Sequence, residues 1–131
     1  MDIAANKAVA ARYFELASSG DLGSTLALFS EDASWEVPGS WELARTYRGD
    51  DLRDLLASLS QFKGGLRFRH HSVTAEEDRV VIQTTVEGDL EDGRHYTNEI
   101  IFIFVIREGR IVRITEAPDS AKSRQFWLGK S

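Results

Sequence analysis

The sequence predicts an α+β domain, with three helices and one short strand before residue 66 and four antiparallel strands after it. Two patterns carry this prediction. Apolar residues recur every three or four positions in the first half, whereas segments rich in Val, Ile and Thr alternate with turn signals in the second. Composition adds a third observation, because 131 residues that are 42% apolar and 28% charged suit one buried core. Residues 1–131 are therefore expected to form a single domain.

The helices of the first half each have a recognisable start. Asp2 is expected to cap the first, which ends near Gly20 and has an apolar side formed by Val9, Tyr13, Leu16 and Ala17. Asp21 begins a short second helix that is expected to reach Phe29. Residues 33–37 alternate as a strand, and residues 38–49 are expected to form a loop. Asp50 then begins the third helix, whose apolar stripe is Leu52, Leu55, Leu56, Leu59 and Phe62.

Four strands are expected in the second half, at residues 66–74, 79–88, 94–107 and 110–117, separated by turns. The centre of the third, residues 100–106, is apolar on both faces and therefore needs cover on both. Helices can cover one face. A second copy of the chain is the simplest cover for the other, so we expect a homodimer through the outward row Ile101, Ile103 and Val105. The segment after Pro118 is the only one with the character of a linker.

Alternation along the strands predicts which side chains face the helices. The inward apolar rows include a few polar residues, which together with Tyr13 of the first helix form a short set: Tyr13, Trp35, Thr84, Asn98 and Glu116. An apolar concavity with a few convergent polar groups is the usual appearance of a small-molecule site. The expected walls of such a site are Trp35, Val37, Thr84, Val86, Phe102 and Phe104.

Glu116 continues the inward row of the last strand, whereas Ile111 belongs to the opposite row. A carboxyl in such a row loses hydration, so its pKa rises and it can exchange protons near neutral pH. We expect Glu116 to act as a general acid/base, with Tyr13 and Asn98 orienting a carbonyl or hydroxyl group. Alternatives stay open: an Arg can pair with Glu116, Tyr13 can be a core residue with a satisfied hydroxyl, and Asn98 can bridge backbone groups.

Several classes of function find no support in the sequence. The 16 basic residues are scattered among 21 acidic ones, for a net charge of −5, so no basic face for nucleic acid is expected. No segment has the ~20 apolar residues of a membrane span and the start does not resemble a signal peptide, so a cytoplasmic protein is expected. Cys is absent, the neighbours His70 and His71 should face opposite sides of a strand, and His95 lies in a separate turn region. Neither a metal nor a cofactor is therefore expected.

Four stretches of the sequence carry a family resemblance: ARYFELASSGDLGSTLALFSEDASWEVPG, TYRGDDLRDLL, DGRHYTNEIIFIFVIREGRIVRI and TEAPD. In this order they cover nearly the whole chain, and the chain resembles the nuclear transport factor 2-like superfamily in its SnoaL-like and ketosteroid isomerase-like branch. The resemblance implies a cone-shaped, curved antiparallel β-sheet wrapped around three N-terminal helices and enclosing a deep apolar pocket. It also implies that homodimers pairing their sheet faces are common.

The resemblance transfers activity only where residues match. Tyr13 falls at the oxyanion-hole tyrosine of ketosteroid isomerases, but their base falls at Val37 and their protonated aspartate near residues 100–102, all apolar here. Limonene-epoxide hydrolase-like members have an Arg and an Asp on the middle strand, which this chain lacks. Both mechanisms are therefore rejected. SnoaL-like cyclases depend mainly on one acid in an apolar pocket, a position that Glu116 matches, and Glu116 with Asp119 fits the family's usual acid-x-x-Asp ending.

Three functions remain in view. The first is a small, cofactor-independent isomerase or cyclase that acts on an apolar metabolite bearing a carbonyl or hydroxyl, with Glu116 as its general acid/base. The second is a non-catalytic binder of a lipophilic ligand, with Trp35, Phe102 and Phe104 as walls. The third is a dimeric interaction module with a vestigial pocket. Fold class alone does not choose between them.

Overall fold

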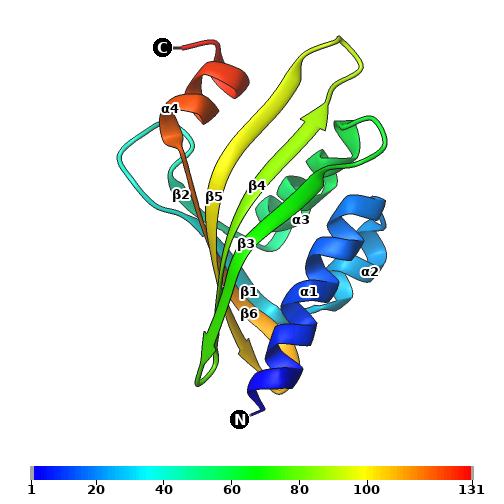
Figure 1. The fold of residues 1–131 in the computed structure, drawn as a ribbon, viewed down its shortest axis with the longest axis vertical. Coiled ribbons are helices and arrows are strands. Elements are labelled where there is room, and N and C mark those ends of the chain that lie inside the picture. The colour runs from blue at the N-terminus through cyan, green and yellow to red at the C-terminus, as the bar shows by residue number, and fades with distance from the viewer. Residues whose placement is uncertain (1, 131) are drawn as a thin grey trace.

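A computed structural model describes residues 2–130 (Figure 1). Three helical elements precede most of the sheet: α1 (Ile3–Ser19), α2 (Leu22–Ala27) and α3 (Gly49–Ala57), which continues into a 3₁₀ turn, η1 (Ser58–Gln61). The strands are β1 (Phe29–Val37), β2 (Arg45–Arg48), β3 (Arg67–Glu76), β4 (Arg79–Asp89), β5 (His95–Arg107) and β6 (Arg110–Pro118). Two short helical segments end the described chain, α4 (Ser120–Ser123) and η2 (Arg124–Leu128), the latter a π-helical turn.

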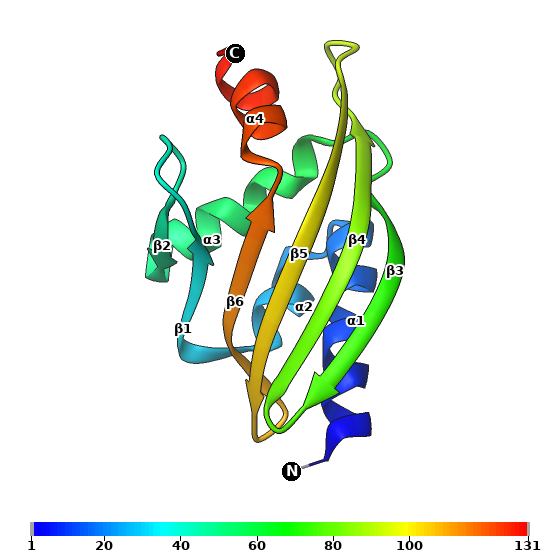
Figure 2. The same cartoon turned by 60° about the vertical axis from the view of Figure 1, so that its left-hand side comes forward.

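The six strands form one sheet in the order β2-β1-β6-β5-β4-β3. All neighbours are antiparallel except β1 and β6, which are parallel. The sheet curves strongly, and α1, α2 and α3 lie against its concave side (Figures 1 and 2). This arrangement confirms the predicted α+β fold, in which a curved sheet wraps around the N-terminal helices.

The local signals at the helix ends work as expected. The Asp2 side chain accepts a hydrogen bond from the Ala5 N–H, and Gly20 ends α1 in the left-handed conformation, with φ of +75°. Asp21 caps α2 in the same way, by accepting from the Ser24 N–H. The expected extension of α2 to Phe29 is wrong. Phe29 begins β1 and pairs with β6, so the chain has already become extended there.

The predicted loop at residues 38–49 contains an unexpected edge strand. β2 pairs with β1 over four residues, and its Arg45 forms an ion pair with Asp51 and places its guanidinium over the Tyr47 ring. These local side-chain contacts stabilise a strand that carries no run of β-branched or apolar residues. The predicted third helix is also shorter than its apolar stripe, since α3 gives way to η1 and Phe62 pairs instead with Leu90 in an isolated bridge.

The predicted inward rows form the core. The buried side chains include Trp35 and Val37 of β1, the row Val80, Ile82, Thr84 and Val86 of β4, and the row Tyr96, Asn98, Ile100, Phe102 and Phe104 of β5. The prediction for Ile111 is wrong, because this side chain is fully buried. The pairing of β5 with β6 shifts register between Val105 and Ile106, and this shift changes the phase of the alternation at the start of β6.

The segment after Pro118 is not a linker. It folds back over the sheet end as α4 and η2 and is held by Asn98, which is fully buried on β5. The Asn98 side chain accepts a hydrogen bond from the Asp119 N–H at 3.0 Å and donates to the Ser123 hydroxyl at 3.0 Å. The ordered tail matters for function because it becomes one wall of the cavity.

Candidate ligand cavity and its acid

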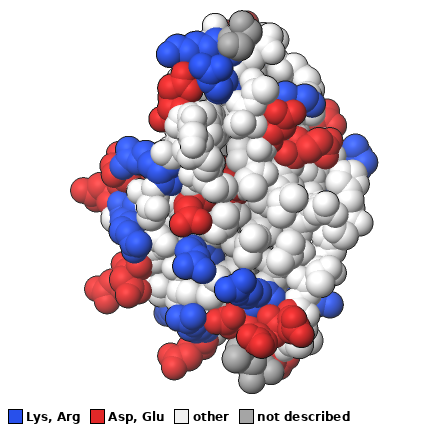
Figure 3. Space-filling model, turned by 90° about the vertical axis from the view of Figure 1, so that its left-hand side faces the viewer, with Lys and Arg blue, Asp and Glu red and all other residues white. Residues whose placement is uncertain are grey.

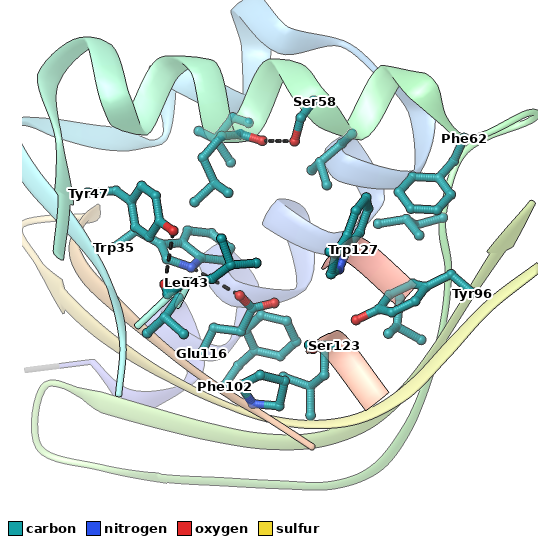
Figure 4. Close-up of a pocket in the computed structure, with 18 of the residues that line it drawn as sticks. Trp35, Leu43, Tyr47, Ser58, Phe62, Tyr96, Phe102, Glu116, Ser123 and Trp127 are labelled. Carbon is teal, nitrogen blue, oxygen red and sulfur yellow. Dashed lines mark hydrogen bonds between the residues drawn. The ribbon is translucent and has the colours of Figure 1, made fainter. Parts of the chain in front are cut away.

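A cavity of about 420 Å³ lies between the concave face of the sheet, α3 with η1, the β1–β2 loop and the tail (Figure 4). Most of its lining is apolar or aromatic. The lining residues are Tyr13, Trp35, Val37, Trp41, Leu43, Tyr47, Leu55, Leu56, Ser58, Leu59, Gln61, Phe62, Leu66, Phe68, Val86, Tyr96, Ile100, Phe102, Glu116, Pro118, Ser123, Trp127 and Leu128. Its size is within the range of small-molecule sites.

Glu116 carries the only carboxyl among these residues. Its side chain rises from β6 into the cavity, with Trp35 on one side and Tyr96 and Trp127 on the other (Figure 4). The Trp35 indole N–H donates to Glu116 Oε1 at 3.3 Å, and no ion pair within residues 2–130 involves this carboxyl. Burial raises the pKa of Glu116 to about 7, against the smaller lowering effect of the Trp35 hydrogen bond. Glu116 is therefore hydrogen bonded to Trp35 and is not paired with an Arg of residues 2–130.

Tyr13 brings a phenol to the same cavity from α1. Its side chain is buried against Phe14, Phe29, Trp35 and Phe104, which fixes the ring. Within residues 2–130, no group is hydrogen bonded to its hydroxyl. Burial raises the pKa of Tyr13, and the negative charge of Glu116 raises it further. The phenol is thus a neutral hydrogen-bond donor that has no acceptor among the described residues.

Asn98, expected to orient the ligand, does not line the cavity. Its amide donates to the Tyr96 hydroxyl at 3.1 Å and also, within the tail, to the Asp119 carbonyl at 3.3 Å. Its hydrogen bonds therefore go to Tyr96 and the tail, as in the backbone-bridging alternative. Tyr96 and Ser123, two of its partners, do reach the cavity wall.

Two of the expected wall residues also lie behind the cavity surface. Phe104 is fully buried among Tyr13, Phe14 and Phe102, and Thr84 bonds to His70 Nδ1 at 3.0 Å. The other expected walls, Trp35, Val37, Val86 and Phe102, line the cavity. Period-two alternation gives the side of the sheet on which a residue lies but not whether a helix or the cavity covers it, which is why these two positions differ.

The remaining wall residues are ones that no sequence pattern predicts. Trp41 and Tyr47 come from the segment read as a loop, and Trp127 and Leu128 come from the tail. The apolar stripe of α3 was visible, and its Leu55, Leu56 and Leu59 do face the cavity. For the wall residues of the loop and the tail, the available signal was the presence of aromatic residues in segments that have no periodic pattern.

His70 and His71 face opposite sides of β3 as alternation predicts, whereas His95, expected in a turn region, begins β5 and pairs with Asp89. His70 contacts Thr84 of the inner row and the Phe14 ring, and burial lowers its pKa, while His71 bonds to Thr85 on the outer side at 2.7 Å. Over residues 2–130, no group of three or more potential His or carboxylate ligands is placed to hold a metal ion. Over the same residues, no helix combines the length and apolar character that a bilayer crossing requires.

Comparison with known proteins shows which family the sequence matches. The profile of one family, described as the SnoaL-like domain, matches residues 10–114. No protein of curated function matches the chain at a significant level. Among solved structures 317 chains match, so the fold is widespread and does not by itself identify a reaction.

Three of these structures illustrate the kinds of protein that share the fold. An NTF2-like protein from Burkholderia xenovorans LB400 is 25% identical, with 93% of this chain and 95% of that chain covered and a TM-score of 0.73. TerC, crystallised with polyporic acid, is 22% identical, with 92% and 96% covered and a TM-score of 0.76. A candidate SnoaL-like polyketide cyclase from Jannaschia sp. CCS1 is 15% identical, with 95% and 93% covered and a TM-score of 0.77.

Proposed function

This chain belongs to the family of SnoaL-like domains, and from that premise we propose that its cavity binds a small, apolar, uncharged molecule bearing a carbonyl or hydroxyl group. We propose further that Glu116 moves a proton on this molecule, in an isomerisation or a cyclisation. One observation carries the proposal: a carboxyl that has no cationic partner among residues 2–130 faces an apolar cavity and has a pKa of about 7. A group poised in this range is suited to both taking and returning a proton.

The charge of the cavity supports an uncharged ligand. None of its lining residues is Lys, Arg or His, so nothing in the wall neutralises a carboxylate or phosphate on the ligand. An anionic group beside Glu116 would meet a second negative charge in a poorly hydrated space. The aromatic walls instead offer broad apolar contact, as a cyclic organic molecule requires.

Tyr13 and Glu116 provide complementary halves of an enolisation. The Tyr13 hydroxyl donates to the carbonyl oxygen of the ligand, while ionised Glu116 takes a proton from the adjacent carbon. The C–H electron pair then forms the C=C bond of the enolate, and the carbonyl π pair moves onto the oxygen that Tyr13 stabilises. Return of the proton from Glu116 to another carbon completes an isomerisation. Attack of the enolate carbon on a second carbonyl of the same molecule completes a ring closure, in which Glu116 protonates the new alkoxide.

The proposal is tested in two steps. Native mass spectrometry of the freshly purified protein identifies any co-purified ligand. Proton NMR in D₂O then measures exchange of the α-protons of 2-tetralone, a bicyclic aromatic ketone, with and without protein. Catalysed exchange that saturates with 2-tetralone is the expected result. Saturable binding without catalysed exchange, for 2-tetralone and for any co-purified carbonyl compound, would contradict proton transfer and favour the non-catalytic binder.

Tyr13→Phe should separate the two roles that a buried tyrosine can have. Because its hydroxyl has no hydrogen-bond partner within residues 2–130, we expect the free energy of unfolding to stay within about 0.5 kcal/mol of wild type. We expect catalysed exchange to fall by about tenfold, because one donor to the developing oxyanion is lost. Urea unfolding and the NMR assay measure the two effects. A loss of stability without a loss of rate would assign the hydroxyl a purely structural role.

A homodimer through the outer sheet face forms the remaining part of the proposal. Figure 3 shows this face, where a broad region without Lys, Arg, Asp or Glu lies to the right of centre and charged side chains lie to its left and below it. On the outer side, Ile101 pairs across the sheet with Gln83 and Ala117, and Ile103 with Val81 and Thr115. Ile101 is 41% exposed in the single chain, which is a high fraction for a residue at the centre of a sheet.

Ile101→Asp is therefore expected to weaken dimerisation by about tenfold or more, because the dimer would bury two unpaired carboxylates. Val73→Asp is the matched control. Val73 is equally exposed, at 43%, but lies at the register position of inward-facing Ile82, so its substitution should leave the dimer intact. Sedimentation velocity over a concentration series measures both. A monomeric wild-type protein would contradict the dimer.

A further inference from the structure

Two segments far apart in the sequence meet at one end of the cavity. The β1–β2 loop contributes Trp41 and Leu43 to the lining, and the tail contributes Ser123, Trp127 and Leu128. The loop and the tail lie side by side in both ribbon views (Figures 1 and 2). Trp127 also contacts the rings of Phe62 and Tyr96, so the tail spans from the loop to the opposite wall.

The contact between these segments is ionic. Arg124 Nε and Nη2 donate to Glu42 Oε1 and Oε2 at 2.8 and 2.9 Å, and Lys130 Nζ lies 3.4 Å from Oε2. Glu42 stands between the two lining residues of the loop, and Arg124 directly follows a lining residue of the tail. Hydrogen bonds from Arg124 lower the pKa of Glu42 to about 2, so the pair stays ionised throughout the neutral range in which Glu116 titrates.

The tail is held very differently at its base. There, the buried Asn98 side chain accepts a hydrogen bond from the Asp119 N–H and donates to the Asp119 carbonyl and to the Ser123 hydroxyl. Farther along, the rings of Phe126 and Trp127 pack against Tyr96 and Phe62, and the polar contacts are the Glu42 pair and Arg94, which donates to the Phe126 carbonyl at 2.9 Å. Both of these outer contacts involve solvent-accessible charged side chains, whose interactions are weak and sensitive to salt. The base is therefore held by buried hydrogen bonds, whereas the polar contacts of the outer part are exposed and sensitive to salt.

We propose that the Glu42–Arg124 pair is a latch: it holds residues 124–128 as a movable wall that pivots at the base fixed by Asn98, and small molecules reach the cavity when it opens. Glu42 and Arg124 are positioning residues in this proposal, since they act through the placement of Trp127. The proposal goes beyond the chemistry assigned to Glu116 and does not depend on it.

Hydrogen exchange measured by mass spectrometry tests the latch in the full-length protein. Glu42→Gln should speed exchange of amides in peptides covering residues 120–130 by about two- to fivefold, with the sheet unchanged. Glu91→Gln is the matched control, because it removes an exposed carboxylate from the β4–β5 turn that makes no ion pair within residues 2–130. The charge swap Glu42→Arg with Arg124→Glu should restore slow exchange. Unchanged exchange in Glu42→Gln would overturn the latch.

Quenching by acrylamide, a small neutral molecule, tests access to the cavity. In a background of Trp41→Phe and Trp127→Phe, the fluorescence reports Trp35, which is 4% exposed and lines the cavity. Adding Glu42→Gln should raise the quenching constant by about two- to fivefold, and 0.5 M salt should do the same to the background protein but not to the variant. Faster tail exchange with unchanged quenching of Trp35 would overturn the tail as the route into the cavity. Neither readout involves Glu116, so this proposal and the proposed function fail separately.

Discussion

Replacing Glu116 by Gln is expected to slow catalysed exchange of a bound ketone by about 10²–10⁴-fold, the usual contribution of general acid–base catalysis. Affinity for the ketone should stay within about threefold of wild type. Gln keeps the size of the side chain, and its carbonyl oxygen can still accept the Trp35 N–H that now reaches Glu116 Oε1. Only the ability to take a proton is lost, so the effect should fall on the rate and not on binding.

The NMR exchange assay and a binding titration with 2-tetralone measure the two quantities. Glu36→Gln is the matched control, because Glu36 lies on β1 in register with Thr115 of the outer row and does not line the cavity. Its rate should equal that of wild type. If Glu116→Gln exchanges the ketone as fast as Glu36→Gln, Glu116 is not the base.

The pH dependence follows from the same group. A base must be ionised, and burial places the pKa of Glu116 at about 7. The wild-type rate should therefore rise about tenfold per pH unit below 7 and level off above it. An ordinary surface carboxylate would already be ionised near pH 5, so the position of the plateau distinguishes the buried acid from an exposed one.

The sequence predicted the sheet well because alternation is a strong local signal. The inner rows of β4 and β5 are buried as expected, and Glu116 reaches the cavity from the position that its row implied. Ile111 departs from the pattern because a register shift between strands is decided by pairing and not by the residue types of one strand. Edge strand β2 depends on side-chain contacts with α3 and so left no period to detect.

The cavity itself was only partly predictable. Which inward residues face the cavity depends on where α1 and α3 end, and Phe104 lies beneath α1 for this reason. The Asn98 side chain faces inward as predicted but holds the tail and does not reach the cavity. The sequence did not indicate the course of this tail. Long-range packing of an irregular segment leaves no periodic trace.

The lining is apolar at three positions that the family resemblance singled out. Val37, Ile100 and Phe102 occupy positions where ketosteroid isomerases are expected to carry their acidic groups, and all three line this cavity as apolar walls. The polar groups that do line the cavity include Glu116 on β6 and Tyr13 on α1. A single carboxyl in a more apolar cavity is more strongly desolvated than one of several polar groups, which accounts for its raised pKa.

The desolvation that raises the pKa of Glu116 should also cost stability. Its pKa rises from 4.5 to about 7 on folding, so the folded protein holds this proton more tightly than the unfolded chain does. The stability contributed by the protonated group is fully present below pH 4.5 and is lost as the pH rises through 7. The corresponding free energy is up to about 3 kcal/mol, reached when Glu116 is ionised in both states.

Glu116→Gln should therefore be about as stable as wild type at pH 4 and more stable by up to about 3 kcal/mol at pH 8, because Gln stays neutral. Urea unfolding at both pH values measures the difference. Glu36→Gln, run in parallel as the control, should show no such gain in stability at pH 8. A variant that is inactive yet more stable would show that the fold carries Glu116 at a cost, as expected of a group kept for its chemistry. Equal stability of variant and wild type at pH 8 would mean that Glu116 is well hydrated when ionised, and the case for a poised acid would then fail.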